Sequence, residues 1–283
     1  MQFATVCRGL FGLLAALLVS GPALAADTIK IGFMDPLSGP FANVGEHGAR
    51  EMILVIEAVN AAGGVLGGTR FELETFDTKS SPQEALISLK QMTDQGLRYF
   101  FMGNGSNVAI ALSDAVSKHN ARTPDQSILF LNYGAVDPSL TNDKCSFWHF
   151  RFDADTDMKM QALTNYVSGQ KQIKKVYLIN QDYAFGQGVS RAARAMLGQK
   201  RPDVEIVGDD LHPLGKVKDF APYVSKIKAS GADSVITGNW GVDLSLLVKA
   251  AKESGLKADL FTYYSGIVGG PTAIGQAGED IRQ

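Results

Sequence analysis

Residues 103–107, Gly-Asn-Gly-Ser-Asn, have the composition of a small anion-binding loop. An apolar run precedes them and a helical pattern follows, so backbone N–H groups at the glycines would be free to approach a ligand. Ser106 or Asn107 would cap the helix that starts here. No Gly-Lys-Ser/Thr follows, which excludes a P-loop, and the glycine spacing is not that of a dinucleotide site. The loop predicts a carboxylate site, and an ordinary helix entry is the alternative.

Aromatic residues gather after the strands expected in the second half of the chain. They are Tyr183, Phe185, Trp240, Tyr263 and Tyr264. Packing at a rim would also account for aromatic loop residues. Their convergence on one predicted cleft favours an apolar or π-stacking wall for a ligand.

The histidines do not form a metal site. They stand at positions 47, 119, 149 and 212, with no second His or Cys at ligand spacing. His149, beside Trp148 in an apolar stretch, is interpreted as structural. We therefore expect no metal and no cofactor.

A catalytic centre is not indicated either. The chain has no Gly-x-Ser-x-Gly elbow, and Cys145 lies in an apolar segment without an evident base. Asp153, Asp155 and Asp157 fall at a helix entry, where the helix dipole explains them better than acid–base catalysis does. The chain is expected not to be an enzyme.

Strands and helices alternate along the chain, and this pattern must position the loops named above. The expected strands cover residues 28–34, 70–77, 97–102, 127–131, 175–179, 204–207, 234–237 and 260–263. The expected helices cover about 46–61, a segment from 82, 107–118, 156–168, 188–197, 220–229 and 244–253. Such alternation is typical of right-handed βαβ units, which bind ligands beyond the carboxyl ends of their strands.

The fold class is thus predicted as α/β, with two Rossmann-like lobes and a ligand cleft between them. The aromatic segment Cys145–Phe152 is expected to be the strand that crosses between the lobes. The predicted divisions are a leader at 1–25, a first lobe at 26–146, a hinge crossover at 147–153 and a second lobe at 154–283.

The first 25 residues are typical of a secretory signal peptide. Arg8 precedes an apolar run from Leu10 to Val19, and Ala23-Leu24-Ala25 is a small-x-small cleavage site. The run is too short to span a bilayer, which needs about 20 apolar residues. A net charge of −2 without a basic cluster argues against nucleic-acid binding. Cys145 alone remains after cleavage, so no intramolecular disulfide is expected.

Several segments together resemble the periplasmic substrate-binding proteins of branched-chain amino acid type ABC transporters. The resemblance runs over essentially all of residues 27–280, and the order and spacing of the segments carry it. They are Ile29–Phe33, Leu37–Pro40, Val59–Val65, Phe76–Asp77, Ser81–Ala85, Asp137–Thr141, Asp182–Gly188 and Lys218–Phe220. The resemblance implies a type I periplasmic binding protein fold whose lobes close on a ligand and dock on a membrane permease.

The resemblance also implies which residues hold the ligand. Ser106, with neighbouring Asn107, would bind its carboxylate, and backbone groups at Gly134 and Val136 would help. The family commonly has a threonine near Val136, so one hydroxyl is missing. The second-lobe aromatic residues of the family match Phe185, with Tyr183 close by, and Trp240.

Two departures from the family pattern matter. Where amino-acid-binding members place an acid for the α-ammonium, this chain has Tyr263-Tyr264-Ser265, and a buried ammonium without a carboxylate partner is costly. An aromatic or other small organic acid therefore fits better than an α-amino acid, with amides and ureas also open. Family members also continue well past residues 275–280, so a C-terminally truncated chain, with one crossover and an incompletely covered first lobe, is expected.

The favoured function is the periplasmic solute-binding component of an ABC importer, acting as a monomer with a small-molecule ligand and a permease partner. The alternative is a periplasmic amino-acid- or amide-binding sensory module that feeds a signalling partner. An exported enzyme would need a nucleophile, metal or cofactor fingerprint, which the sequence does not show.

Overall fold

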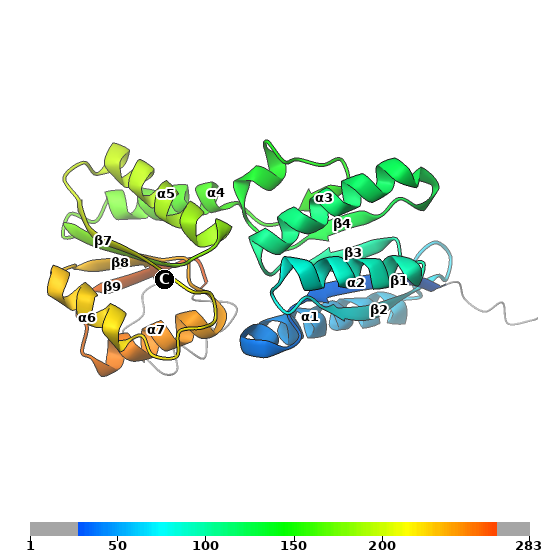
Figure 1. Cartoon of the computed structure of the whole chain (residues 1–283), viewed down its shortest axis with the longest axis horizontal. Coiled ribbons are helices and arrows are strands. Elements are labelled where there is room, and N and C mark those ends of the chain that lie inside the picture. The colour runs from blue at the N-terminus through cyan, green and yellow to red at the C-terminus, as the bar shows by residue number, and fades with distance from the viewer. Residues whose placement is uncertain (1–27, 265–283) are drawn as a thin grey trace, which may run out of the picture.

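Two separate parallel sheets organise the chain, as the alternation of strands and helices predicts (Figure 1). The computed structural model describes residues 28–264. The predicted leader, Ser265 and the end of the chain lie outside this range. Within the described residues, no helix combines the length and apolar composition that a bilayer crossing requires.

The first sheet has five strands in the order β2-β1-β3-β4-β5. Its strands are β1 (Thr28–Asp35), β2 (Arg70–Asp77), β3 (Tyr99–Met102), β4 (Leu129–Asn132) and β5 (His149–Arg151). Its helices are α1 (Ala42–Ala61), α2 (Pro82–Asp94) and α3 (Ser106–Arg122), with short 3-10 turns η1 (Gly39–Phe41), η2 (Pro124–Gln126) and η3 (Pro138–Thr141).

The second sheet has four strands in the order β7-β6-β8-β9. Its strands are β6 (Lys175–Gln181), β7 (Glu205–His212), β8 (Ser234–Thr237) and β9 (Asp259–Thr262). Its helices are α4 (Thr156–Ser168), α5 (Ala184–Lys200), α6 (Ala221–Ser230) and α7 (Gly241–Glu253). One large apolar cluster fills this lobe, with β6 and β8 buried at its centre.

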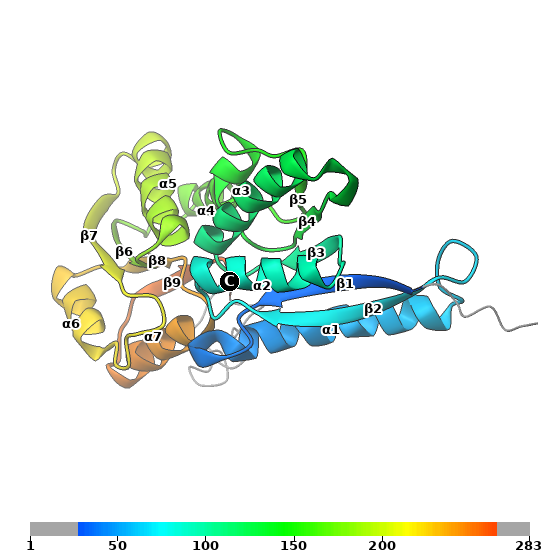
Figure 2. The ribbon, with the colours of Figure 1, turned by 45° about the vertical axis from the view of Figure 1, so that its right-hand side comes forward.

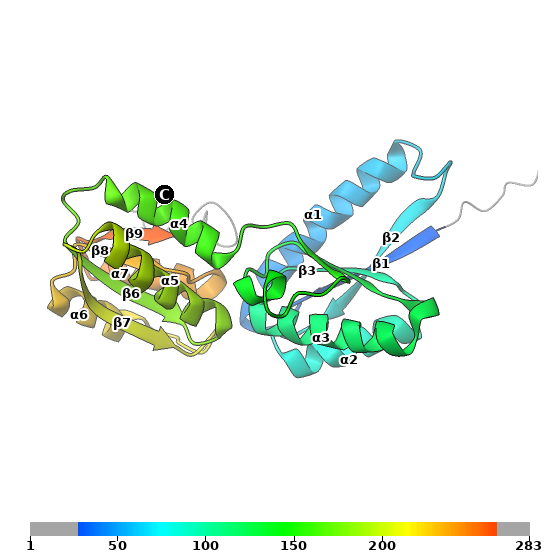
Figure 3. The same cartoon turned by 90° about the horizontal axis from the view of Figure 1, so that it is seen from above.

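Both faces of the first sheet are apolar, because a parallel sheet is normally covered on both sides. On one face Phe100, Met102 and Phe130 pack against α2 and α3. On the other face the strand register aligns Phe33, Phe101 and Leu131 in one row. Of the helices in the described part of the chain, α1 alone lies on that second face (Figures 2 and 3).

α1 leaves part of the second face open as an apolar groove of about 320 Å³. The groove is lined by Ile29, Ile31, Met52, Val55, Ile56, Val59, Phe71, Tyr99, Phe101 and Leu131. Tyr99 on β3 is 44% exposed there, and Phe150 on the edge strand β5, in register with Leu131, is 49% exposed. Among the described residues, this face of the first sheet is therefore only partly covered.

The prediction of a crossing strand at 145–152 is wrong in its bounds and in the place it gives the strand. Only residues 149–151 form a strand, β5, and β5 pairs with β4 as the edge of the first sheet. Phe147 and Phe152 are exposed, and Cys145 is an exposed free thiol outside any strand. The chain passes between the lobes after β5, just before α4 (Figure 3).

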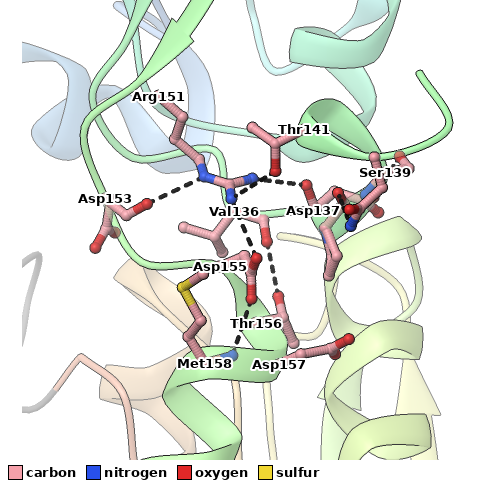
Figure 4. A network of polar contacts seen from close by, with 12 residues as sticks. Val136, Asp137, Ser139, Thr141, Arg151, Asp153, Asp155, Thr156, Asp157 and Met158 are labelled. Atoms are coloured by element: carbon pink, nitrogen blue, oxygen red, sulfur yellow. Dashed lines mark hydrogen bonds and ion pairs between the residues drawn. The ribbon is translucent and has the colours of Figure 1, made fainter. Parts of the chain in front are cut away.

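A buried arginine fixes the start of this passage (Figure 4). Arg151 donates to the carbonyl oxygens of Asp153 and Asp137, each at 3.0 Å, and forms an ion pair with Asp155 at 3.2 Å. Asp155 in turn caps α4 by accepting from the backbone N–H of Met158 at 2.9 Å. Asp155 thereby has a structural role at this helix entry.

Four helices begin earlier than their sequence patterns predict, and one of them is α7, which begins at Gly241 rather than 244. α1 begins at Ala42 rather than 46, α3 at Ser106 rather than 107, and α5 at Ala184 rather than 188. The glycines near the start of α5 do not favour a helix, so the sequence pattern does not predict its first turn. Gly186 nevertheless has a packing role there. A Cβ on Gly186 would lie 1.9 Å from the carbonyl oxygen of Gln181, so only glycine allows this close start.

Candidate functional site

The carboxyl ends of both sets of strands carry most of the predicted ligand residues. In the first lobe these ends are followed by the loops around Asp35, Gly103 and Tyr133, and in the second lobe by those around Tyr183 and Trp240. Open parallel sheets bind ligands at these ends. The two lobes also touch, since α3 contacts α5 and η1 contacts α7.

A buried carboxylate organises the first-lobe loops. One oxygen of Asp35, at the end of β1, accepts from the backbone N–H groups of Gly103 and Asn104 at 3.3 and 2.9 Å. Its other oxygen accepts from the amide of Asn104 at 2.9 Å and from the hydroxyl of Tyr133. Burial raises the pKa of Asp35 to about 6, and these hydrogen bonds oppose the rise. Asp35 and Tyr133 are functional-site neighbours that no local sequence pattern indicates.

The glycine-rich loop leads into α3 without a side-chain cap. Gly105, at φ +105°, is the N-cap residue, and no side chain bonds to the first turn. The expectation that Ser106 or Asn107 caps the helix is therefore wrong. Ser106 is instead the first helical residue and is buried, and Asn107 keeps a buried side-chain oxygen without a hydrogen-bond partner. The first N–H groups of an uncapped helix remain available to an anion.

One backbone group at Gly134 and one at Val136 are bonded within the protein. The N–H of Gly134 donates to the side chain of Asn132 at 3.1 Å. The carbonyl of Val136 accepts from the N–H and hydroxyl of Thr156, at 2.9 and 3.1 Å, across the junction of the lobes (Figure 4). Gly134 is therefore held within the first-lobe loop, and Val136 joins that loop to α4.

Phe185 is not a loop residue, contrary to the sequence-based expectation. It lies in the first turn of α5, is 2% exposed, and belongs to the core of the second lobe. Its ring is surrounded by those of Tyr183, Tyr263 and Tyr264, with centroids 5.9 to 6.3 Å away. The predicted aromatic residues thus form one contiguous cluster, with Phe185 at its interior.

Trp240 and Tyr183 are joined by a hydrogen bond. The indole Nε1 of Trp240 donates to the hydroxyl of Tyr183 at 2.8 Å, and Trp240 is the N-cap residue of α7. Burial raises the pKa of the Tyr183 phenol. The other face of this pair meets the first lobe, where the ring of Phe41 lies 4.3 Å from that of Trp240, centroid to centroid.

Tyr264 has a cation above its ring. The ammonium of Lys159 lies 5.1 Å from the ring centroid and is paired with Asp153 at 2.5 Å. Burial raises the pKa values of both Tyr263 and Tyr264. The hydroxyl of Tyr263 is buried without a hydrogen-bond partner. Lys159 was not identified from the sequence, since it lies in the first turns of α4, more than a hundred positions before Tyr264.

A buried polar row crosses the second sheet below this cluster. Gln181 pairs in register with His212, whose Nε2 lies 3.0 Å from the side-chain oxygen of Asn239. Gln181 also donates to Asp243 at 2.8 Å. The pKa of Asp243 is raised by burial. Within residues 28–264, no group of three or more His, Cys, Asp or Glu side chains could hold a metal ion.

Two parallel-sheet lobes whose strand ends meet at one boundary define a two-lobe binding protein. The chain matches the family model described as periplasmic binding protein over residues 28–282. The chain belongs to this family. The resemblance inferred from the sequence segments is thereby confirmed.

Curated relatives carry Leu/Ile/Val-binding names. The chain is 35% identical over 266 residues to Leu/Ile/Val-binding protein homolog 4 of Brucella abortus, covering 93% of this chain and 62% of that protein. It is 24% identical over 254 residues to the leucine-, isoleucine-, valine-, threonine- and alanine-binding protein of Pseudomonas aeruginosa, covering 87% and 64%. The chain thus spans less than two thirds of the length of these relatives.

Solved structures share the fold. A leucine-, isoleucine-, valine-, threonine- and alanine-binding protein from Brucella ovis, in a closed conformation, superposes with a TM-score of 0.75 at 33% identity, covering 90% of this chain and 64% of that one. A solute-binding protein from R. palustris in complex with 4-hydroxybenzoate gives 0.70 at 24% identity, covering 83% and 61%.

Proposed function

We propose that this chain is the periplasmic solute-binding component of an ABC importer and that it captures a small carboxylate, with an aromatic or other organic acid favoured over an α-amino acid. It would act without catalysis, as a receptor whose closed form docks on a membrane permease. The observation that supports the ligand class is the pair Lys159 and Tyr264: a lysine held by Asp153 lies over a tyrosine of the loop in which amino-acid-binding members of the family place an acid.

The first-lobe side of the proposed site is suited to a carboxylate. The uncapped start of α3 offers N–H groups and the positive end of its dipole, with the hydroxyl of Ser106 beside them. The fixed loop around Gly103 and Asn104, held by Asp35, keeps that start in place. Each is a feature of binding rather than of catalysis.

The second-lobe side supplies apolar surface. Tyr183, Trp240 and the tyrosines around Phe185 form an aromatic wall. The same fold holds 4-hydroxybenzoate in the R. palustris protein, so an aromatic acid is compatible with this architecture. The amino-acid names of the Brucella and Pseudomonas relatives make leucine the competing ligand to test.

Thermal unfolding of the purified chain with benzoate, 4-hydroxybenzoate or leucine tests the proposal. A ligand at a hundred times its Kd adds about 2.7 kcal/mol to the free energy of unfolding. We expect stabilisation by an aromatic acid and none by leucine. Stabilisation by leucine alone would reject the proposed ligand class.

Ser106→Ala tests the assigned carboxylate contact by calorimetric titration with the acid that stabilises the chain. Loss of one hydrogen bond to a charged group should weaken binding roughly tenfold or more. Ser81→Ala is the matched control, because Ser81 caps α2 by accepting from the N–H of Glu84 at 3.4 Å. It should lower stability and leave affinity unchanged.

A further inference from the structure

Phe41 belongs to the first lobe by sequence and to the second lobe by packing. It ends η1 and immediately precedes α1. Its side chain is only 2% exposed, and it is part of the apolar cluster of the second lobe rather than that of the first. Val44, one turn further along α1, is buried in the same cluster.

The ring of Phe41 has a rigid platform on the second lobe. It lies against the indole of Trp240 with centroids 4.3 Å apart and planes inclined by 35°. The hydrogen bond from Trp240 to the hydroxyl of Tyr183 fixes the indole from its other end. An aromatic pair held in this way contributes more than apolar area alone.

Two glycines with left-handed backbones make room for the ring. Gly215 has φ +65° and Gly241 has φ +59°. A Cβ on Gly215 would lie 2.7 Å from Cε2 of Phe41, and a Cβ on Gly241 would lie 2.9 Å from Cδ1. Any larger residue at either position would displace the ring or the backbone.

Gly215, Trp240 and Gly241 form the seat of the Phe41 ring, and Asp243 holds the two glycine segments of this seat together. One oxygen of its buried carboxylate accepts from the N–H of Gly215 at 2.9 Å and from the amide of Gln181 at 2.8 Å. Asp243 lies in the first turn of α7, directly after Gly241 and Val242. The loop that contains Gly215 and the start of α7 are therefore fixed around the ring of Phe41.

We propose that Phe41 is the closing residue of the first lobe, and that insertion of its ring between Gly215, Trp240 and Gly241 closes the two lobes without a ligand. This inference rests on the proposed two-lobe binding function and adds a determinant of closure to it. Because Phe41 already stabilises the closed arrangement, a ligand has to supply only the remainder of the closing free energy. Phe41 also occupies one face of Trp240, which limits the ligand to the rest of the aromatic wall.

Small-angle scattering of the ligand-free chain tests this inference through the radius of gyration. Phe41→Ala should lower the ratio of closed to open molecules by at least about tenfold, because removal of one buried aromatic side chain exceeds the ~1.4 kcal/mol of a tenfold change. The radius of gyration should then rise above that of the unsubstituted chain. Circular dichroism establishes that each variant remains folded.

Gly215→Ala approaches the same contact from the other lobe, and Gly255→Ala is its matched control. Both glycines have φ +65°, so the backbone strain is alike, but a Cβ on Gly255 meets no atom within 4 Å. We expect Gly215→Ala to open the ligand-free chain as Phe41→Ala does, and Gly255→Ala to leave the radius unchanged. Adding Gly215→Ala to Phe41→Ala should cause no further opening, because the obstructed ring is gone.

Unchanged scattering in both Phe41→Ala and Gly215→Ala would overturn the inference. A larger radius of gyration in Gly255→Ala would overturn it as well, because backbone strain from an alanine at positive φ, rather than lost room for the Phe41 ring, would then explain the opening. No ligand enters this experiment. Failure of the closing role and failure of the proposed carboxylate function are therefore distinguishable, because the latter appears only in the thermal unfolding with added ligands.

Discussion

The ammonium of Lys159, on α4, lies 5.1 Å from the centre of the Tyr264 ring, at the carboxyl end of β9. The two residues are brought together because α4 packs beside the second sheet, and Asp153 holds the lysine from the other side at 2.5 Å. A positive charge at this position disfavours a ligand ammonium, and Asp153 offsets part of that charge. Exchange of charges around Tyr264 should therefore change ligand affinity in predictable directions.

Lys159→Met should weaken the binding of an aromatic acid by roughly fivefold, corresponding to about 1 kcal/mol of lost attraction in a partly solvated setting. Asp153→Asn should have the opposite effect, because it leaves the lysine charge without its local counter-ion. Calorimetric titration with benzoate measures both. If Lys159→Met and Asp153→Asn changed the affinity for benzoate equally and in the same direction, an electrostatic role for Lys159 would be contradicted.

Tyr183→Phe should destabilise the second lobe by about 1–3 kcal/mol, because the buried indole N–H of Trp240 loses its acceptor. Urea unfolding followed by circular dichroism measures the loss. Tyr166→Phe is the control, since Tyr166 is exposed and should tolerate the change. An unchanged free energy of unfolding in Tyr183→Phe would mean that water replaces the hydroxyl, and that Trp240 is not fixed as described.

The alternation of strands and helices was enough to predict two α/β lobes, and the fourth helix was predicted with its exact bounds, Thr156–Ser168. The missed first turn of α5 contains glycines, which have low helix propensity, and a tertiary contact at Gly186 requires one of them. The crossing strand was misassigned because an apolar, aromatic run predicts a strand without indicating which sheet it joins.

The sequence was enough to predict which loops form the candidate site, but not which residues contact one another there. The rule for parallel sheets identified the loops that contain Ser106, Tyr183 and Trp240. The partners that define their environment come from distant parts of the chain, as in Asp35 with Tyr133 or Phe41 with Trp240. Local spacing carries no information on such pairs, and neither a lone aspartate nor a phenylalanine after Gly-Pro signals its partner.

Arg151→Met should destabilise the protein by about 3 kcal/mol, because it leaves the buried carboxylate of Asp155 without a counter-ion. The side chains of this pair are 5% and 7% exposed. Arg191→Met is a suitable control, since Arg191 and Asp157 are exposed and 3.7 Å apart, and such pairs contribute about 0–1 kcal/mol. Urea midpoints compare the two, and similar losses would contradict the role assigned to the Arg151 network.

The open apolar face of the first sheet should bind a hydrophobic dye. Tyr99→Lys combined with Phe150→Lys places two charges on that face and should reduce the fluorescence of bound anilinonaphthalene sulfonate several-fold. The melting temperature should change little, since both residues are substantially exposed. Leu66→Lys, at a lone exposed leucine, should leave the dye signal unchanged. Dye binding that persists in the double variant would assign the signal to another surface.

The pH dependence of stability should report the buried carboxylate of Asp35. Its pKa is raised by burial from 3.8 to about 6, so the folded chain binds this proton more tightly than the unfolded chain does. The contribution of this group is therefore fully present below about pH 4 and is lost as the pH rises through about 6. A rise of about two pKa units corresponds to roughly 3 kcal/mol over that window.

Asp35→Asn removes the titrating group, so the stability of the unsubstituted chain relative to this variant should fall between pH 4 and 6 in urea unfolding. Asp114→Asn, which removes an exposed carboxylate paired with Lys118, is the control substitution. A constant difference between the unsubstituted chain and Asp35→Asn across that range would mean that Asp35 remains ionised in the folded protein, stabilised by the donors from Gly103, Asn104 and Tyr133.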